Sequence, residues 1–186
     1  MIITIDEIIS LHPIEQIHAV QLFDLVNVNR YLLRKWLPWV DKMRTLDHFQ
    51  LFITEAKKRQ LAGTESGYVI MVDGQMAGRI GLYNIDHQNK IASIGYWLDE
   101  GLQGKGIMSR CTLEMTNFGF NIVGLNRIEI RCATDNFKSQ AIPERLNFVK
   151  EGVIRQGEFV QHRFIDLYSY AMLKDNWHTN GLVQGF

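Results

Sequence analysis

The sequence predicts a mixed α/β (α+β) fold in which helices cover both faces of a central sheet. Its apolar residues follow a helical period up to about residue 63, alternate as in strands from about residue 68 to 98, and become helical again after Gly106. Asp73-Gly74, between two apolar runs, is a strong hairpin signal. Since no linker rich in Pro, Gly or Ser divides the 186 residues, we expect a single domain over residues 1–186.

The first third of the chain predicts one strand and three helical pieces. Glu7 to Leu11 resembles a strand, and Pro13 suits the first turn of a helix. A second helical piece covers residues 29–36, and Thr45 is a suitable N-cap for a helix that ends near Gly63. The apolar positions of the first helix are Ile14, Ile17, Val20, Leu22 and Leu25.

The rest of the chain predicts six strands and two helices. The hairpin consists of residues 68–72 and 75–83, and a third strand covers Ile91 to Leu98. A helix follows Gly106, and a short helix covers Lys138 to Leu146. The remaining strands are predicted at Arg127 to Ala133, Phe148 to Arg155 and Glu158 to Met172.

Composition excludes several classes of function. Twenty basic and twenty acidic residues give a formal net charge of zero, so the sequence shows no broad basic surface for nucleic acid. No apolar run reaches the roughly 18 to 20 residues of a membrane span, and the first residues lack a signal-peptide pattern. We therefore expect a soluble, cytoplasmic protein with no nucleic acid or membrane as partner.

The cysteines and histidines do not suggest a metal or covalent centre. Cys111 and Cys132 lack a C-x-x-C spacing, and we expect both to be buried thiols. The six histidines show no metal-ligand spacing, so no metal site is expected. No Ser, His and acid arrangement indicates a covalent triad, which favours direct transfer chemistry.

A glycine-rich loop, D-E-G-L-Q-G-K-G-I-M-S-R from Asp99 to Arg110, follows the apolar strand I-G-Y-W-L. It is not a P-loop, because Gly104-Lys105 is followed by glycine instead of Ser or Thr. It is not a dinucleotide fingerprint, because Ser109 stands where the third glycine is needed. A strand, a glycine turn and a helix N-terminus remain, and together they form an anion site suited to a pyrophosphate.

The loop resembles the acetyl-CoA pyrophosphate loop, Q/R-x-x-G-x-G/A, of the GCN5-related N-acetyltransferase (GNAT) family. Gln103 and Gly106 match the pattern, whereas Met108 replaces the usual Gly or Ala. The resemblance implies a GNAT-like, mostly antiparallel sheet of about seven strands with helices on both faces. The residues it implies for acetyl-CoA binding in the loop are Gln103, Gly104, Lys105, Gly106, Ile107, Met108 and Ser109.

A second motif, between Thr134 and Gly152, is similar to the N-x-x-S, L-G-F and E-G of the RimL-like branch, which acetylates ribosomal-protein N-termini. The resemblance implies that Asn136 and Ser139 contact the pantetheine arm and the thiol of CoA. Read without it, Asn136 is a helix cap and Ser139 a first-turn hydroxyl. Asn147 replaces the glycine of L-G-F, and asparagine also adopts the left-handed conformation there.

The strand that ends in Tyr96, Trp97 and Leu98 completes the implied cofactor site. In the family this strand splays from its neighbour, and its free backbone groups pair with pantetheine. The Leu98 N–H is then the expected donor to the thioester carbonyl. Read without the resemblance, Tyr96 and Trp97 are alternating strand residues that face opposite sides of the sheet.

The resemblance also implies the catalytic roles. Glu158 occupies the position of the base proposed for RimL-like enzymes, and Ser139 is our candidate general acid for the departing thiolate. His162 lies four residues beyond Glu158 and is kept as a candidate near the acceptor. Trp36 and Trp39 fall where the family covers its acceptor groove, although two tryptophans in a turn are equally typical of core packing or of a homodimer contact.

The sequence thus predicts an acetyl-CoA-dependent N-acetyltransferase whose acceptor is the α-amino group of a protein N-terminus, as in the ribosomal-protein enzymes. Two alternatives stay open. One is acetylation of a small amine such as a polyamine or an aminoglycoside. The other is a non-catalytic CoA-binding sensor, for which Met108 is the only indication.

Overall fold

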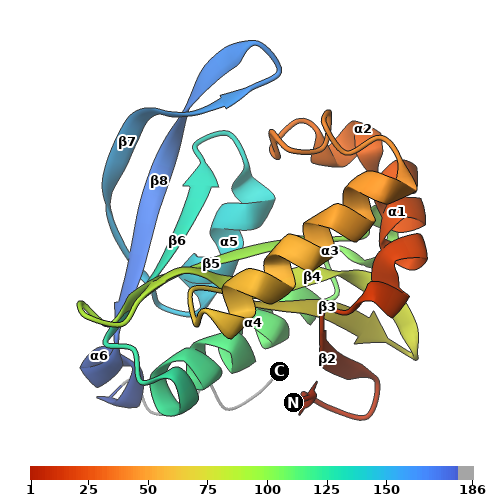
Figure 1. The fold of residues 1–186 in the computed structure, drawn as a ribbon. Helices are drawn as coiled ribbons and strands as arrows, with labels where there is room; N and C mark the ends of the chain where they lie inside the picture. The colour runs from red at the N-terminus through yellow and green to blue at the C-terminus, as the bar shows by residue number, and fades with distance from the viewer. Residues whose placement is uncertain (180–186) are drawn as a thin grey trace.

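The computed structural model describes residues 1–179, which form an eight-stranded sheet with helices on both faces (Figure 1). The strand order is β1-β2-β3-β4-β5-β6-β8-β7, and every pairing is antiparallel except that of β5 with β6. The strands are β1 Ile3–Thr4, β2 Ile9–Pro13, β3 Ser66–Val72, β4 Gln75–Asp86, β5 Ile91–Leu98, β6 Arg127–Ala133, β7 Val149–Val160 and β8 Arg163–Leu173. The predicted mixed α/β fold with a mostly antiparallel sheet is confirmed.

The sheet separates the hydrophobic core into two layers, and each layer is covered by helices. On one face, α1 and α3 pack Leu22, Phe49 and Ile53 against the sheet, and on the other α4 packs Cys111 and Met115. The helices are α1 Ala19–Val28, α2 Arg30–Leu33, α3 Leu46–Leu61, α4 Ile107–Phe118, α5 Phe137–Arg145 and α6 Lys174–Thr179. Shorter pieces are the 3-10 turns Gln16–His18 and Glu100–Leu102 and the π-helical Gly119–Val123. No helix among residues 1–179 is long and apolar enough to cross a membrane.

The central elements match their predicted positions. Thr45 is the N-cap of α3, and β3 and β4 are joined by Asp73-Gly74, whose φ angles of 49° and 74° suit a type I′ turn. Gly106, with φ 73°, is the N-cap of α4. Asn147 has φ 58° just after α5, so asparagine adopts the left-handed conformation expected there.

The N-terminal helix was predicted in the wrong place. Pro13 is the last residue of β2 instead of a first-turn residue, and α1 begins only at Ala19. Ile17 and Val20, predicted for the apolar face, are 80% and 55% exposed, whereas Val26 is buried. Proline fits the end of a strand because its missing N–H then breaks no ladder hydrogen bond.

The last hairpin also differs from the prediction. The chain turns at Gln161-His162, where both residues have positive φ, and not between Arg155 and Glu158. Residues 155–157 instead form an irregularity inside β7, between the pairs Ile154–Leu167 and Glu158–Ile165. Glu158 therefore lies within a strand and not at the start of one.

The parallel pairing of β5 with β6 positions the site. It covers only Ile91–Ser93 of β5 and Arg127–Glu129 of β6, after which the two strands separate. Both strands continue for several more residues without a partner across the gap. The middle of the sheet therefore opens at the carboxyl ends of these two strands.

Candidate active site

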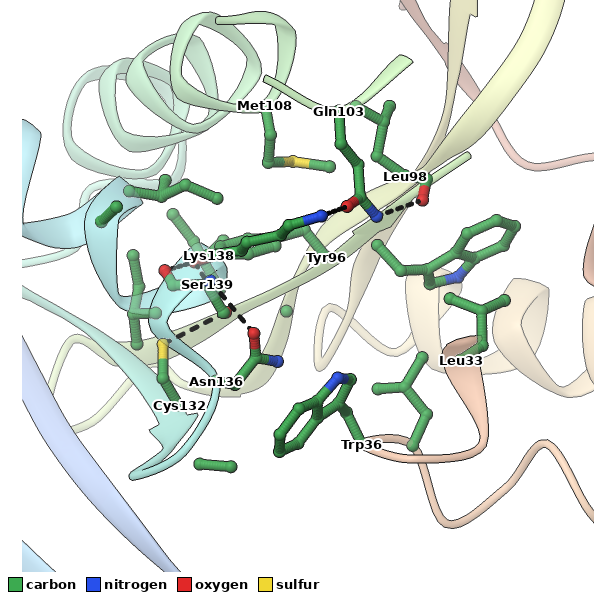
Figure 2. Close-up of a pocket in the computed structure, with 18 of the residues that line it drawn as sticks. Leu33, Trp36, Tyr96, Leu98, Gln103, Met108, Cys132, Asn136, Lys138 and Ser139 are labelled. Carbon is green, nitrogen blue, oxygen red and sulfur yellow. Dashed lines mark hydrogen bonds between the residues drawn. The ribbon is translucent and has the colours of Figure 1, made fainter. Parts of the chain in front are cut away.

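A cleft of about 920 Å³ lies at the opening between β5 and β6 (Figure 2). Its walls come from β5 and β6, the loop before α4, the start of α5, the segment after α2 and β7. Predicted site residues that line it are Trp36, Tyr96, Trp97, Leu98, Gln103, Gly104, Gly106, Ile107, Met108, Ser109, Asn136, Ser139 and Glu158. The fold thus brings together most of the residues predicted from two distant motifs.

The backbone of β5 presents polar groups to this cleft. The Asp99 N–H donates to the carbonyl of Ala77, which lies within β4. Because an antiparallel ladder alternates sides, the N–H and C=O of Leu98 face away from β4, toward the gap. The Gln103 Nε2 donates to the Leu98 carbonyl at 3.4 Å, which confirms that direction. The Leu98 N–H points into the cleft at the end of β5.

The N-terminus of α4 forms the second wall. Gly106 caps the helix without a side-chain hydrogen bond, so its first-turn amides have no capping side chain. A Cβ on Gly104 or Gly106 would meet no atom within 4 Å, so the backbone is open to close approach. Exposed amides and the positive end of the helix dipole favour an anion at this position.

Two basic residues beside this loop were missed by the sequence analysis. The Lys138 Nζ donates to the Gln103 Oε1 at 3.0 Å (Figure 2), and the Arg145 guanidinium donates to the Ser109 hydroxyl at 2.6 Å. Both residues belong to α5 and line the cleft. Only the packing of α5 beside the loop reveals them, because they are more than thirty residues away in sequence.

Ser139 lies at the centre of a small hydrogen-bond network. Its hydroxyl is 3.3 Å from the Cys132 sulfur and 3.4 Å from the Tyr96 hydroxyl, which in turn donates to the Ser139 carbonyl. Burial holds the pKa of the Tyr96 phenol well above its usual value and raises the pKa of the Cys132 thiol. All three groups therefore stay protonated at neutral pH.

Asn136 acts as a helix cap and also lines the cleft. Its Oδ1 accepts the backbone N–H of Ser139 at 3.2 Å, which fixes the first turn of α5. This bond aims the Ser139 side chain into the cleft (Figure 2). The predicted N-x-x-S motif is thus a local unit in which the asparagine orients the serine.

Glu158 is half-buried on β7 at the other end of the cleft. Burial raises the pKa of its carboxyl, and no charged partner contributes to that shift. Trp36 lies nearby, packed on a small cluster of Ala133, Val160, Ile165 and Leu167. A carboxylate that has no charged partner and lies in a sheltered cleft can accept a proton and act as a general base.

Three predicted residues do not line this cleft. Lys105 is exposed at the tip of the loop, and His162 is exposed at the turn between β7 and β8. Trp39 lies on the other side of β5, where its ring centroid is 6.5 Å from that of Trp97. Lys138 and Arg145, and not Lys105, are the cations that line this cleft beside the loop.

Met108 does not damage the loop. Its side chain is 7% exposed, packs in the core under the loop and lines the cleft wall. The backbone path from Gln103 to the helix is therefore compatible with methionine at this position. Among residues 1–179, no group of three or more His, Cys, Asp or Glu could hold a metal ion.

The sequence matches the acetyltransferase (GNAT) domain over residues 9–149. The chain belongs to the GNAT acetyltransferase family. A Bacillus subtilis protein named for ribosomal N-acetyltransferase activity is 35% identical over 93% of this chain and 95% of its own length. The ribosomal-protein-serine acetyltransferase of Escherichia coli is 28% identical over 94% of this chain and 97% of its own length.

A solved structure gives the same fold. The ribosomal-protein α-N-acetyltransferase RimL, in complex with coenzyme A through a cysteine disulfide, has a TM-score of 0.91 and is 29% identical. The similarity covers 95% of this acetyltransferase and 99% of that chain. The family predicted from the two motifs is confirmed, and with it an acetyltransferase activity.

We expect neither cysteine of this acetyltransferase to carry an acetyl group. Burial raises the pKa of the Cys111 thiol to about 12 and raises that of Cys132, so neither is an activated thiolate. The double variant Cys111→Ala with Cys132→Ala should keep its turnover while losing roughly 0.5 to 3 kcal/mol of stability per site. Steady-state kinetics and thermal unfolding measure the two effects. An acetylated enzyme trapped without acceptor would contradict this expectation.

Proposed function

We propose that this GNAT acetyltransferase transfers acetyl from acetyl-CoA directly to the α-amino group of a protein N-terminus, and that its acceptor is a ribosomal protein. The observation that carries the proposal is the cleft itself, in which an open β5 edge, a helix N-terminus and the Glu158 carboxylate converge. The ribosomal acceptors named for the relatives agree with it. Such an acceptor implies a cytoplasmic enzyme, working as a single domain over residues 1–186.

The residues of the cleft fit acetyl-CoA. The first-turn amides of α4, with Gln103 and the nearby Lys138 and Arg145, would hold the pyrophosphate. The free edge of β5 from Tyr96 to Leu98 would pair with the amides of the pantetheine arm, like an added strand. When bound, acetyl-CoA supplies the activated acetyl group as a thioester.

Protein groups then divide the work of the transfer. The Leu98 N–H donates to the thioester carbonyl oxygen as negative charge develops there. The Ser139 hydroxyl, supported by the protonated Tyr96, gives a proton to the departing thiolate. The amine nitrogen would attack the carbonyl carbon and form the amide bond while the C–S bond breaks and releases CoA. Glu158 accepts the proton that the nitrogen loses, directly or through one water.

The strength of this base suits an α-amine. An α-amino group with a pKa of about 7.7 to 8.0 lies within roughly a unit of neutral pH. A lysine with a pKa of about 10.4 needs roughly 4.6 kcal/mol for deprotonation at pH 7. A single carboxylate without a cationic partner meets the first requirement more readily than the second. Trp36 would cover the acceptor at this end of the cleft.

An acetylation screen tests the proposal. Purified enzyme and acetyl-CoA are incubated with ribosomal proteins, polyamines and aminoglycosides, and each product is analysed by mass. One acetyl group on a ribosomal-protein N-terminus is expected. Acetylation of the small amines alone would contradict the proposal. A homodimer stays a prediction that equilibrium sedimentation of the full chain tests.

A further inference from the structure

A second cavity, of about 290 Å³, lies between β4 and β5 and the layer of α1 and α3. Most of its lining is apolar, and no aspartate or glutamate of the described residues lines it. Two hydrogen-bond donors from β4, Arg79 and Tyr83, line it. Tyr96 also lines it, but the Tyr96 hydroxyl donates to the Ser139 carbonyl. The residues that line both this cavity and the acetyl-CoA cleft are Leu37, Gly95, Tyr96 and Trp97.

A row of glycines forms the floor beside these donors. Gly67, Gly81 and Gly95 are directly paired across β3, β4 and β5. A Cβ on Gly67 would lie 3.0 Å from the Arg79 Nη2, and a Cβ on Gly81 would lie 3.1 Å from the Tyr83 hydroxyl. The missing side chains therefore leave the room in which Arg79 and Tyr83 lie flat on the sheet.

Arg79 is a buried cation that has no charged partner among residues 1–179. It is 7% exposed, and its guanidinium carbon lies 4.5 Å from the centroid of the Phe52 ring. Its Nε and Nη2 atoms have no hydrogen-bond partner in the described part of the chain. A buried charge normally requires pairing or hydrogen bonds, because its desolvation is costly.

The Glu65 carboxylate, on the same side of Gly67, does not neutralise Arg79. Glu65 is 5% exposed, but its Oε2 accepts the Arg59 Nε at 2.5 Å. Its Oε1 faces the same glycine as the Arg79 Nη2, at 3.2 Å from the Cβ position of Gly67, and is not paired with Arg79. Two guanidinium groups and one carboxylate leave this corner with one uncompensated positive charge.

We propose that this cavity binds a carboxylate side chain near the N-terminus of the acceptor, with Arg79 and Tyr83 as its donors. The inference rests on the proposed function, because it needs a peptide whose amine lies in the adjoining cleft. Leu37 and Trp97 line both the cleft and the cavity, so a side chain next to the acceptor amine would lie beside the cavity. A carboxylate supplies the missing charge, and its methylene groups suit the apolar walls. Arg79 and Tyr83 are thus specificity-determining residues.

Matched peptides test this inference on the wild-type protein. Each peptide carries a free N-terminus with Asp or Glu at the first, second or third position, and its partner carries Asn or Gln there. We expect one acidic peptide to exceed its amide partner in kcat/KM by at least about 10-fold, since buried charge pairing favours it. Acetylation with a ratio near one at every position would overturn the cavity inference and leave the proposed function standing. Acetylation of no peptide would overturn both.

Two variants locate the preference. Arg79→Met keeps an unbranched apolar stem without the guanidinium and should lower kcat/KM for the acidic peptide at least about 30-fold, with the amide peptide changed less than about 3-fold. Tyr83→Phe removes only a hydroxyl and should reduce the ratio more weakly, which keeps the test decisive if Arg79→Met does not fold. Lys150→Met is the control, because it also removes a cation that stacks on an aromatic ring, 3.8 Å from the Tyr168 centroid. An acid-to-amide ratio that both cavity variants leave unchanged would overturn the assignment.

Discussion

Glu158→Gln should lower kcat by roughly 100-fold, with little change in acetyl-CoA affinity or acceptor KM. Positioned general bases typically contribute about 100- to 10,000-fold, and glutamine keeps the size of the side chain while removing its basicity. Raising the pH should recover part of the rate, because an α-amine with a pKa of about 7.7 to 8.0 then deprotonates by itself. Steady-state kinetics from pH 6 to 9 measure these effects.

Stability provides the control for this variant. Burial raises the pKa of Glu158, so the folded state binds its proton at higher pH than the unfolded state does. Stability from this group is therefore present at low pH and is lost as pH rises through the raised pKa. At neutral pH the glutamine variant should be at least as stable as the parent.

Glu151→Gln, on the same strand but outside the cleft, is the matched control and should keep the parent kcat. Parental turnover of Glu158→Gln at every pH would remove Glu158 as the base.

Gly106→Asp should weaken CoA binding by at least about 100-fold. The change places a negative charge at the helix N-terminus that is proposed to hold the pyrophosphate, where two or more charge-assisted hydrogen bonds, each worth about 1.5 to 3 kcal/mol, would be lost. A Cβ at this position meets no atom within 4 Å, so the fold has to absorb only the left-handed φ of 73°. Aspartate tolerates that conformation better than most residues.

Gly124→Asp is the matched control for this loss. Gly124 also has a left-handed φ, 80°, and open space around its Cβ, but it does not line the cleft. This control should bind CoA with the parent affinity, as measured by calorimetry. Unchanged affinity of Gly106→Asp would show that the pyrophosphate binds elsewhere.

Local signals in the sequence predicted much of the fold and of the cofactor cleft. The Asp73-Gly74 turn, the Gly106 cap and the Asn136 cap each depend on a few adjacent residues, and each is found where it was predicted. The turn at Gln161-His162 was missed because neither residue is a typical choice for positive φ.

Residues that depend on packing could not be predicted. Lys138 and Arg145 border the α4 loop only because α5 packs beside it. In the sequence, Arg79 is a single charged residue in an apolar strand. Its lack of a charged partner is visible only in the structure, where Glu65 pairs with Arg59. Long-range contacts of this kind leave no periodic pattern in the sequence.

The site of acetylation on a peptide tests the central claim most directly. One peptide has a free α-amine and no lysine, and its partner has a blocked N-terminus and one free lysine. Each is incubated with the enzyme and acetyl-CoA at pH 7, and fragmentation mass spectrometry locates the product. The account predicts one acetyl group on the α-amine of the first peptide and modification of the second that is slower by at least about 100-fold. Deprotonation at pH 7 costs a lysine roughly 3.5 kcal/mol more than it costs an α-amine, and the site offsets only part of this difference. Equal or faster acetylation of the lysine peptide would contradict it.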